Sequence, residues 1–242
     1  MTVRINNALF ALMVATIAVG CVLTGRAEDI KKPTGFAGYL LDSRGLEENK
    51  DDSAWREDFE SPGVSWRYLY QDGSVKIDEH KRVEEFCHEG RRSELLRYAV
   101  EEPGVVVFGH YVDYPGIYAD VSPSLWVRSD RPGVSLAALV VFPKTIRPDN
   151  GKPLVALIPG SSYQKPGEWQ KLEFPHGLEK TLEKTIQSIR GEHKTPASAE
   201  CAYVRQILLL SEARAGRYSL WIDDLKIEGS FPQNVESLPR GL

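Results

Sequence analysis

The sequence predicts an all-β fold, an antiparallel β-sandwich of the jelly-roll type, with one amphipathic helix inserted near 178–191. Three patterns predict it. About ten short apolar runs follow one another between 55 and 228, at the spacing typical of sandwiches. Turn residues, drawn from 20 glycines and 15 prolines, separate these runs. One stretch alone carries its apolar residues at helical spacing.

Five strands are expected in the first half of the domain, each bounded by turn residues. Ser61-Pro-Gly63 ends the first strand, and Pro103-Gly104 ends the fourth. In the second strand, alternation predicts that Trp66, Tyr68 and Tyr70 share one face. The expected strands are 55–60, 64–70, 75–83, 93–100 and 105–112.

The second half continues the pattern, with the helix as its one interruption. The stretch 134–142 is apolar throughout, which predicts a strand buried on both faces. Leu178, Leu182, Ile186 and Ile189 recur at helical spacing with charged residues between them, which predicts the helix. The expected strands are 124–129, 134–142, 154–158, 169–174, 204–210 and 218–228.

The closing strand, 218–228, gives the first hint of chemistry. Strict alternation predicts Leu220 on one face and Trp221 with Leu225 on the other. Asp223 and Asp224 interrupt this pattern, and adjacent strand residues point to opposite faces, so one of the two should point inward. A buried carboxylate is costly unless a cation or several donors satisfy it. The pair therefore indicates a bound ion more than a reaction.

The N-terminal residues predict export. Arg4 precedes an almost continuous apolar run from Ala8 to Thr24, and 25–27 fits a small-x-small cleavage site. The expected organisation is a signal peptide at 1–27, a flexible linker at 28–53, the sandwich at 54–230 and a C-terminal linker at 231–242. A lipoprotein signal with lipidation at Cys21 and an uncleaved membrane anchor remain alternatives. The product would be secreted, periplasmic or membrane-anchored.

Charge and cysteine content limit the partners. The net charge is −4 and no basic stripe is present, so no nucleic-acid partner is expected. Contact with a membrane is expected only through the N-terminal segment. Besides Cys21, the chain has Cys87 and Cys201, which form either a disulfide in an oxidising compartment or two separate thiols. The sequence does not set the oligomeric state.

Catalytic motifs are missing from the sequence. It contains no Gly-x-Ser-x-Gly elbow, no phosphate loop and no dinucleotide fingerprint. The five histidines show no familiar zinc spacing. We therefore expect a protein that is not an enzyme.

Four stretches together resemble the galactose-binding-like β-sandwiches, which include many carbohydrate-binding modules of secreted glycoside hydrolases. They are Asp58-Phe-Glu60, 124–128, 167–172 and 220–227, and the resemblance covers 54–230. It implies a non-catalytic exported module that binds a polysaccharide or other glycan, the N-terminal part of a larger glycan-active protein. The alternative is a structural or protein-interaction module at the cell envelope without a sugar ligand.

The resemblance also implies a structural calcium ion held between the first and last strands. Calcium takes several hard oxygen ligands, which carboxylates from two strands can supply. Ion pairs of these acids with arginines such as Arg56 or Arg67 are the alternative. The expected calcium ligands are Asp58, Glu60, Asp223 and Asp224.

Sugar binding in such modules uses aromatic rings that stack on the apolar faces of pyranose rings. Three tyrosines surround the Pro115-Gly116 turn and are the better surface candidates. Most strand aromatics are expected to lie in the core. The expected ligand-binding residues are Tyr111, Tyr114, Tyr118, Trp126 and Tyr163.

Overall fold

The structure, a computed structural model, describes residues 54–71, 75–112, 116–117, 121–193 and 197–229. Internal contacts divide the chain into 1–52 and 53–242, and the described residues belong to the second unit. The predicted signal peptide, both predicted linkers, Tyr114 and Tyr118 lie outside the described residues. Within those residues, no helix is long and apolar enough to cross a bilayer.

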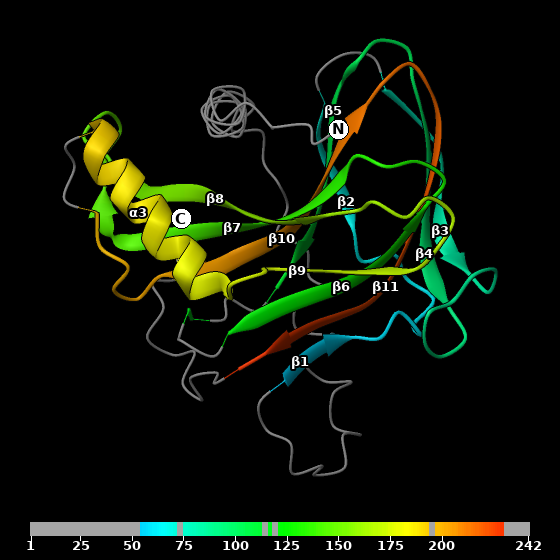
Figure 1. The fold of residues 1–242 in the computed structure, drawn as a ribbon, viewed down its shortest axis with the longest axis horizontal. Helices are drawn as coiled ribbons and strands as arrows, with labels where there is room; N and C mark the ends of the chain where they lie inside the picture. Colours follow the sequence, from blue (N-terminus) through cyan, green and yellow to red (C-terminus); the bar gives the residue numbers. More distant parts are fainter. Residues whose placement is uncertain (1–53, 72–74, 113–115, 118–120, 194–196, 230–242) are drawn as a thin grey trace, which may run out of the picture. The chain divides into compact units, whose positions relative to one another are not determined.

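Two antiparallel sheets form a sandwich, which confirms the predicted fold class (Figure 1). The first strand pairs with the last, so the two ends of the described chain meet in one sheet. Sheet A has the order β3 (Val75–Val83), β4 (Ser93–Val100), β11 (Gly216–Glu228), β6 (Ser122–Ser129) and β9 (Gln170–Glu173), with β1 (Ala54–Glu57) paired to β11. Sheet B has the order β2 (Arg67–Gln71), β5 (Gly104–Tyr111), β10 (Tyr203–Ala213), β7 (Val134–Ile146) and β8 (Pro153–Ser162).

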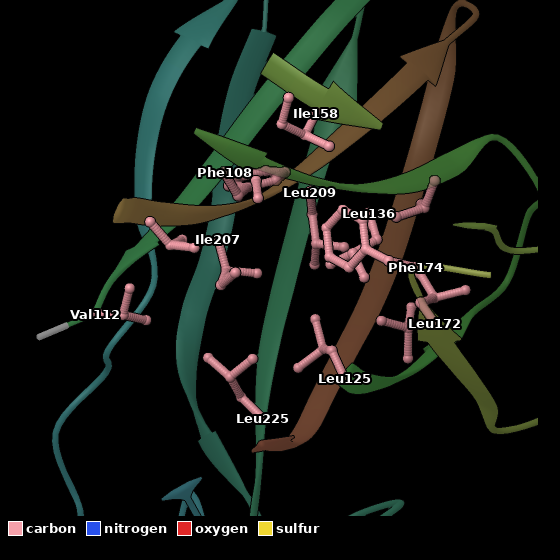
Figure 2. Packing of buried hydrophobic residues seen from close by; sticks show 14 of the residues in the cluster. Phe108, Val112, Leu125, Leu136, Ile158, Leu172, Phe174, Ile207, Leu209 and Leu225 are labelled. Atoms are coloured by element: carbon pink, nitrogen blue, oxygen red, sulfur yellow. The ribbon is translucent and has the colours of Figure 1, made fainter. Parts of the chain in front are cut away.

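The hydrophobic core lies between the sheets. Because strand side chains alternate, every second residue of each strand faces the opposite sheet. Leu125 and Leu172 of sheet A and Phe108 and Leu209 of sheet B are each 0% exposed in this core (Figure 2). Burying one such side chain contributes about 1.5–3 kcal/mol, so the core dominates the stability of the sandwich.

Helix α3 (Leu178–His193) confirms the predicted helix and is two residues longer. Its buried residues Leu178, Leu182 and Ile186 fall at helical spacing and join the core, where the helix contacts β8. Glu179 lies in the first turn, where a negative charge interacts favourably with the helix dipole. The helix thus adds its apolar side chains to the sandwich core.

The closing strand departs from the predicted alternation. Leu220 and Leu225 both lie in the core, although strict alternation places them on opposite faces. The register between β11 and β6 shifts between Asp223 and Lys226, and Asp224 has φ 47°. This bulge adds one residue and reverses the alternation. Asp223 lies before the bulge and follows the core residue Ile222, so it points away from the core, yet it is 0% exposed.

The first two strands are shorter than expected. β1 ends at Glu57, and Phe59 has φ 64°, which a strand cannot continue. Asp58 and Glu60 therefore follow the strand instead of lying in it. In β2 the register shifts between Tyr68 and Tyr70, so the single aromatic face predicted for 64–70 is wrong.

Candidate functional site

The structure separates the predicted ligand-binding residues. Tyr111 ends β5 on the outer face of sheet B and is 46% exposed. Trp126 lies half-buried on the outer face of sheet A, since its neighbours Leu125 and Val127 fill the core. These two outer faces lie on opposite sides of the sandwich. Tyr111 and Trp126 therefore do not form one site.

Tyr163 is a core residue, which corrects its prediction as a ligand contact. It is 0% exposed, and its hydroxyl lies among the main-chain carbonyls of Ser129, Lys165 and Glu168. A buried tyrosine needs such a partner for its O–H group. The residue ties the segment after β8 to the end of β6. That segment leads directly to Trp169, so Tyr163 positions a tryptophan.

Aromatic side chains gather on the outer face of sheet A. Trp126 and Arg128 come from β6, and Trp221 comes from the neighbouring strand β11, paired directly with Arg128. Trp169 precedes β9, and Phe86 and His88 come from the loop 84–92 between β3 and β4. We call these six residues the aromatic patch. None of them belongs to the core between the sheets.

The rings of the aromatic patch contact one another in two groups. His88 stacks on Trp126 with ring centroids 3.7 Å apart, and Trp169 meets His88 edge-on at 5.9 Å. Phe86 meets Trp221 edge-on at 5.2 Å, and the guanidinium of Arg128 lies 4.0 Å from the Phe86 ring centroid. Trp126, His88 and Trp169 are half-buried and Phe86 is 42% exposed. The patch therefore presents aromatic surface to solvent.

Two carboxylates hold loop 84–92 against sheet A. Asp223 Oδ2 accepts the main-chain N–H groups of His88 and Glu89, at 2.8 and 3.2 Å. Glu60 Oε1 accepts those of Arg91 and Arg92, at 2.7 and 3.0 Å. These hydrogen bonds fix the backbone that carries the two loop rings of the aromatic patch.

Gly90 makes this attachment of the loop sterically feasible. It has φ 66°, a conformation that glycine adopts without strain. A Cβ atom at this position would lie 2.3 Å from Glu60 Oε1. A side chain at residue 90 would therefore displace the carboxylate that accepts the two main-chain N–H groups.

The two anchoring carboxylates differ in their pKa shifts. Burial raises the pKa of Asp223, and the N–H groups of His88, Glu89 and Asp224 offset part of that rise. The N–H groups of Arg91 and Arg92 lower the pKa of Glu60. The difference follows from burial, because Asp223 is removed from water while Glu60 is solvated.

The predicted calcium ligands have other partners in the structure. Asp224 pairs with Arg56 at 2.8 Å, Asp58 accepts the N–H of Glu60, and Glu60 and Asp223 anchor the loop. Across the described ranges, no three His, Cys, Asp or Glu side chains are placed to hold one metal ion. The donor set as arranged does not fit a calcium ion. Calcium binding stays a prediction.

A second group of polar residues lies inside the sandwich, around Glu94. Glu94 is 0% exposed and accepts the N–H groups of Ser65 and Trp66, at 2.9 and 3.0 Å. His80 Nε2 lies 2.6 Å from one carboxylate oxygen, and Arg82 Nη1 lies 3.1 Å from the other. The group joins β3, β4 and the segment before β2. Because Glu94 has no solvent access, this group is structural.

Glu57 and His110 extend this internal group. His110 is 6% exposed and lies edge-on to Trp55 and Trp66, with its Nε2 3.8 Å from Glu57 Oε2. Burial favours the neutral form of Glu57, but the neighbouring His110 ring and the charge of Arg82 outweigh it and lower its pKa. Glu57 is therefore a paired carboxylate at the edge of the core.

Both cysteines of the sandwich are free thiols in the structure. Cys87 lies half-buried in loop 84–92, and Cys201 is exposed before β10. Burial raises the pKa of Cys87, and the charges of Asp223, Glu60 and Glu84 add to the rise. Of the two alternatives from the sequence, the structure contains the separate thiols.

Glu94, His88 and Arg128 were not among the predicted site residues. The position of Glu94 was visible in the sequence, because strict alternation from Leu96 and Tyr98 places it on the inner face of 93–100. The same rule places Trp126 and Arg128 together on one face of 124–129. No sequence pattern brings His88 to Trp126, since that contact depends on how loop 84–92 folds over sheet A.

The chain resembles solved carbohydrate-binding modules with β-sandwich folds. No family model matches the sequence, and no curated protein matches it. A family 11 carbohydrate-binding module from Clostridium thermocellum, in complex with a β-1,3-1,4-mixed-linked tetrasaccharide, has a TM-score of 0.45 and 10% identity, covering 75% of this chain and 98% of that chain. The C-terminal family 22 module of Clostridium thermocellum Xyn10B has a TM-score of 0.41 and 11% identity, covering 78% and 100%.

A third structure, TmCBM61 in complex with β-1,4-galactotriose, has a TM-score of 0.36 and 16% identity, covering 76% of this chain and 99% of that chain. All three structures are carbohydrate-binding modules, the group of proteins that the sequence was expected to resemble. At such low identities and TM-scores, the function of this chain has to be argued from its own residues.

Proposed function

We propose that this chain is a non-catalytic carbohydrate-binding module and that the aromatic patch is its glycan-binding surface. The observation that carries the proposal is the position of Trp126 and Trp169. Both tryptophans lie half-buried outside the core and both contact His88. Aromatic rings on a sheet face offer stacking surface for sugar rings, and the flanking polar groups can hydrogen-bond to hydroxyls.

The fixed loop supports this proposal. Binding to a preorganised surface loses less conformational entropy than binding to a mobile one. Asp223 and Glu60 hold loop 84–92 through four main-chain hydrogen bonds, and Tyr163 holds the segment before Trp169. The rings of the patch therefore occupy defined positions before any ligand arrives.

The non-catalytic and exported character belongs to the same proposal. Glu94 and Asp223, the most buried acids described, are each 0% exposed and committed to internal partners. A glycosidase needs two carboxylates that reach the substrate. The apolar run from Ala8 to Thr24 supports export, which would bring the module to extracellular glycans.

Affinity electrophoresis of the full chain in gels that contain neutral or acidic polysaccharides tests this function. We expect at least one polymer to retard the protein. Trp126→Ala should weaken that binding about fivefold or more, because one stacked ring contributes about 1 kcal/mol. Tyr111→Ala is the matched control, since it removes an exposed aromatic ring from the other outer face.

The Tyr111→Ala control also identifies the result that would place the glycan-binding surface on the other sheet. If Tyr111→Ala abolished binding and Trp126→Ala did not, the glycan surface would be the outer face of sheet B. Circular dichroism and a thermal melt of each variant separate lost binding from lost folding.

A second candidate function, a protein-interaction module without a sugar ligand, is favoured by the outer face of sheet B. Leu69 and Tyr111 lie there and are 39% and 46% exposed, while Val107, Ala137 and Leu208 of the same face are each only 1% exposed. The apolar surface of this face is therefore that of Leu69 and Tyr111. Apolar surface of this kind is typical of protein interfaces. Absence of retardation by every polymer would favour this candidate.

A further inference from the structure

Arg128 is an arginine without an anionic partner. Its side chain forms no hydrogen bond or ion pair with any residue that the structure describes, and it lies near the rings of Phe86, at 4.0 Å, and Trp221, at 6.0 Å. Arg56, Arg82 and Arg97, three other arginines of sheet A, each pair with a carboxylate. The aromatic patch thus contains a positive charge that no described residue neutralises.

The donors around Arg128 also lack acceptors. Three buried nitrogen atoms of the aromatic patch have no hydrogen-bond partner in the described structure: Arg128 Nε, Trp221 Nε1 and His88 Nδ1. Trp221 itself is only 7% exposed. Buried donors are normally satisfied, and unsatisfied ones cost free energy. The aromatic patch therefore contains unsatisfied donors, and the half-buried side chain of Arg128 is the one whose charge an acceptor oxygen of a ligand can approach.

The nearest acid along β11 does not supply such an oxygen. Asp223 directs its carboxylate to the main-chain N–H groups of His88, Glu89 and Asp224. Lys171, which pairs with Trp126 across β6 and β9, adds a second cation at the edge of the patch, although Glu173 lies 3.6 Å from it. The patch therefore favours a negatively charged ligand, although the whole chain carries a net charge of −4.

We propose that the aromatic patch selects sugars that carry a carboxylate, that is, uronic-acid residues of an acidic polysaccharide. The guanidinium of Arg128 would bind the carboxylate, because its planar fork matches the two oxygens. Trp126 and Trp169 would hold the sugar rings. The inference rests on the proposed glycan-binding function and adds the chemical class of the ligand.

Polymer pairs that differ in charge test this inference. The full chain is run in native gels that contain polygalacturonate, alginate or hyaluronate, and in gels with methyl-esterified polygalacturonate, xylan or mixed-linkage β-glucan. Titration calorimetry then gives the affinity for the polymers that bind. We expect retardation by at least one acidic polymer and at least about tenfold weaker binding to a neutral one, with affinity falling as NaCl is added.

Variants at Arg128 connect the charge preference to the patch. Arg128→Gln should weaken binding to the acidic polymer at least about tenfold, and Arg128→Lys should restore part of it, because lysine keeps the charge but not the fork. Arg217→Gln is the matched control. Arg217 is an exposed residue of the same strand as Trp221, about 13 Å away, and its replacement changes the net charge equally.

The possible outcomes separate the two proposals. Equal binding to acidic and neutral polymers, lost in Trp126→Ala and unchanged in Arg128→Gln, would overturn the acidic class and keep the glycan-binding function. If Arg128→Gln and Arg217→Gln weakened binding to the acidic polymer equally, the preference for acidic polymers would depend only on net charge. That result would also overturn the proposed acidic class of ligand. Absence of binding to every polymer would overturn both.

Discussion

Glu94 and Asp223 are both fully buried carboxylates of sheet A, and they lie on opposite faces of it. Glu94 faces the core, where Arg82 and His80 approach its two oxygens along with two main-chain N–H groups. Asp223 faces outward, where loop 84–92 covers it and three main-chain N–H groups are its donors. One carboxylate therefore has a charged side-chain partner, Arg82, and the other has only main-chain donors.

The difference indicates different roles. Removing Glu94 would leave Arg82, whose side chain is only 4% exposed, with Glu57 at 3.3 Å as its remaining carboxylate partner. Removing Asp223 would leave only main-chain N–H groups, which solvent can satisfy once the loop moves. We therefore expect Glu94 to control the stability of the whole sandwich. Asp223 should control the aromatic patch.

The largest expected effect is that of Glu94→Ala. Breaking a buried ion pair by removing one partner costs about 3–5 kcal/mol of unfolding free energy. Arg82 Nη1 has no aligned hydrogen-bond acceptor even in the intact chain, but Glu57 lies 3.3 Å from Nη2 and remains, so the loss should fall toward the lower end of this range. Urea denaturation measures the loss. A decrease below about 1 kcal/mol would show that the inner group is solvated and would remove the contrast with Asp223.

A smaller and more local effect is expected for Asp223→Ala. Loss of the acceptor for His88, Glu89 and Asp224 should cost about 1–3 kcal/mol. Hydrogen exchange should accelerate in loop 84–92, and glycan retardation should weaken as in Trp126→Ala. Asp223→Asn keeps one acceptor oxygen and should retain more of both properties. Uniform acceleration of exchange over all strands would contradict the local role.

The sequence predicts the two layers and the helix, because each depends on local periodicity or turn chemistry. That the first and last strands are neighbours is implied only by the family resemblance. The sequence also places Trp126 and Arg128 on one face. The strict alternation predicted for 218–228 is wrong from Asp223 and Asp224 onward, where a bulge reverses it. The predicted first strand, 55–60, is too long, because the positive φ of Phe59 ends β1 before Asp58 and Glu60. One inserted residue moves every later side chain to the other face, and no periodicity reveals it in advance.

The dependence of stability on pH should also differ between the inner and outer carboxylates. Glu57 of the inner group has a lowered pKa, so its contribution is present above its unfolded pKa and is lost as the pH falls. Asp223 has a raised pKa, so its contribution is greatest below its unfolded pKa and is lost as the pH rises through the folded value. Glu57→Gln should therefore make the acid loss of stability shallower, and Asp223→Asn should make it steeper.

Urea denaturation at several pH values from about 3 to 7 measures both slopes across the range in which carboxyl groups ordinarily titrate. The two substitutions serve as controls for each other, since each removes one titrating carboxyl group and keeps its shape. Shifts of the same sign in both variants would contradict the assignment of opposite pKa changes.

The smallest effect is expected for Asp224→Ala, and it bears on the calcium prediction. Arg56 is the partner of Asp224, and both side chains have solvent access, 41% for Arg56 and 15% for Asp224. Such a pair contributes at most about 1 kcal/mol, so the Tm should fall only slightly. A calcium ion bound between Glu60 and Asp224 would behave differently. It would raise the Tm of the natural chain by mass action, chelator would reverse the rise, and Asp224→Ala would abolish it.

Arg56→Ala is the control that separates these two interpretations of Asp224. If the ion pair with Arg56 is its main interaction, Arg56→Ala and Asp224→Ala should lower the Tm by similar amounts, and chelator should change neither melt. If calcium occupies this end of β11, Arg56→Ala should retain the calcium response, because removing a competing cation leaves the carboxylate free to bind the ion. A chelator-sensitive Tm in Arg56→Ala alone would mean that the arginine takes the place that calcium would otherwise fill.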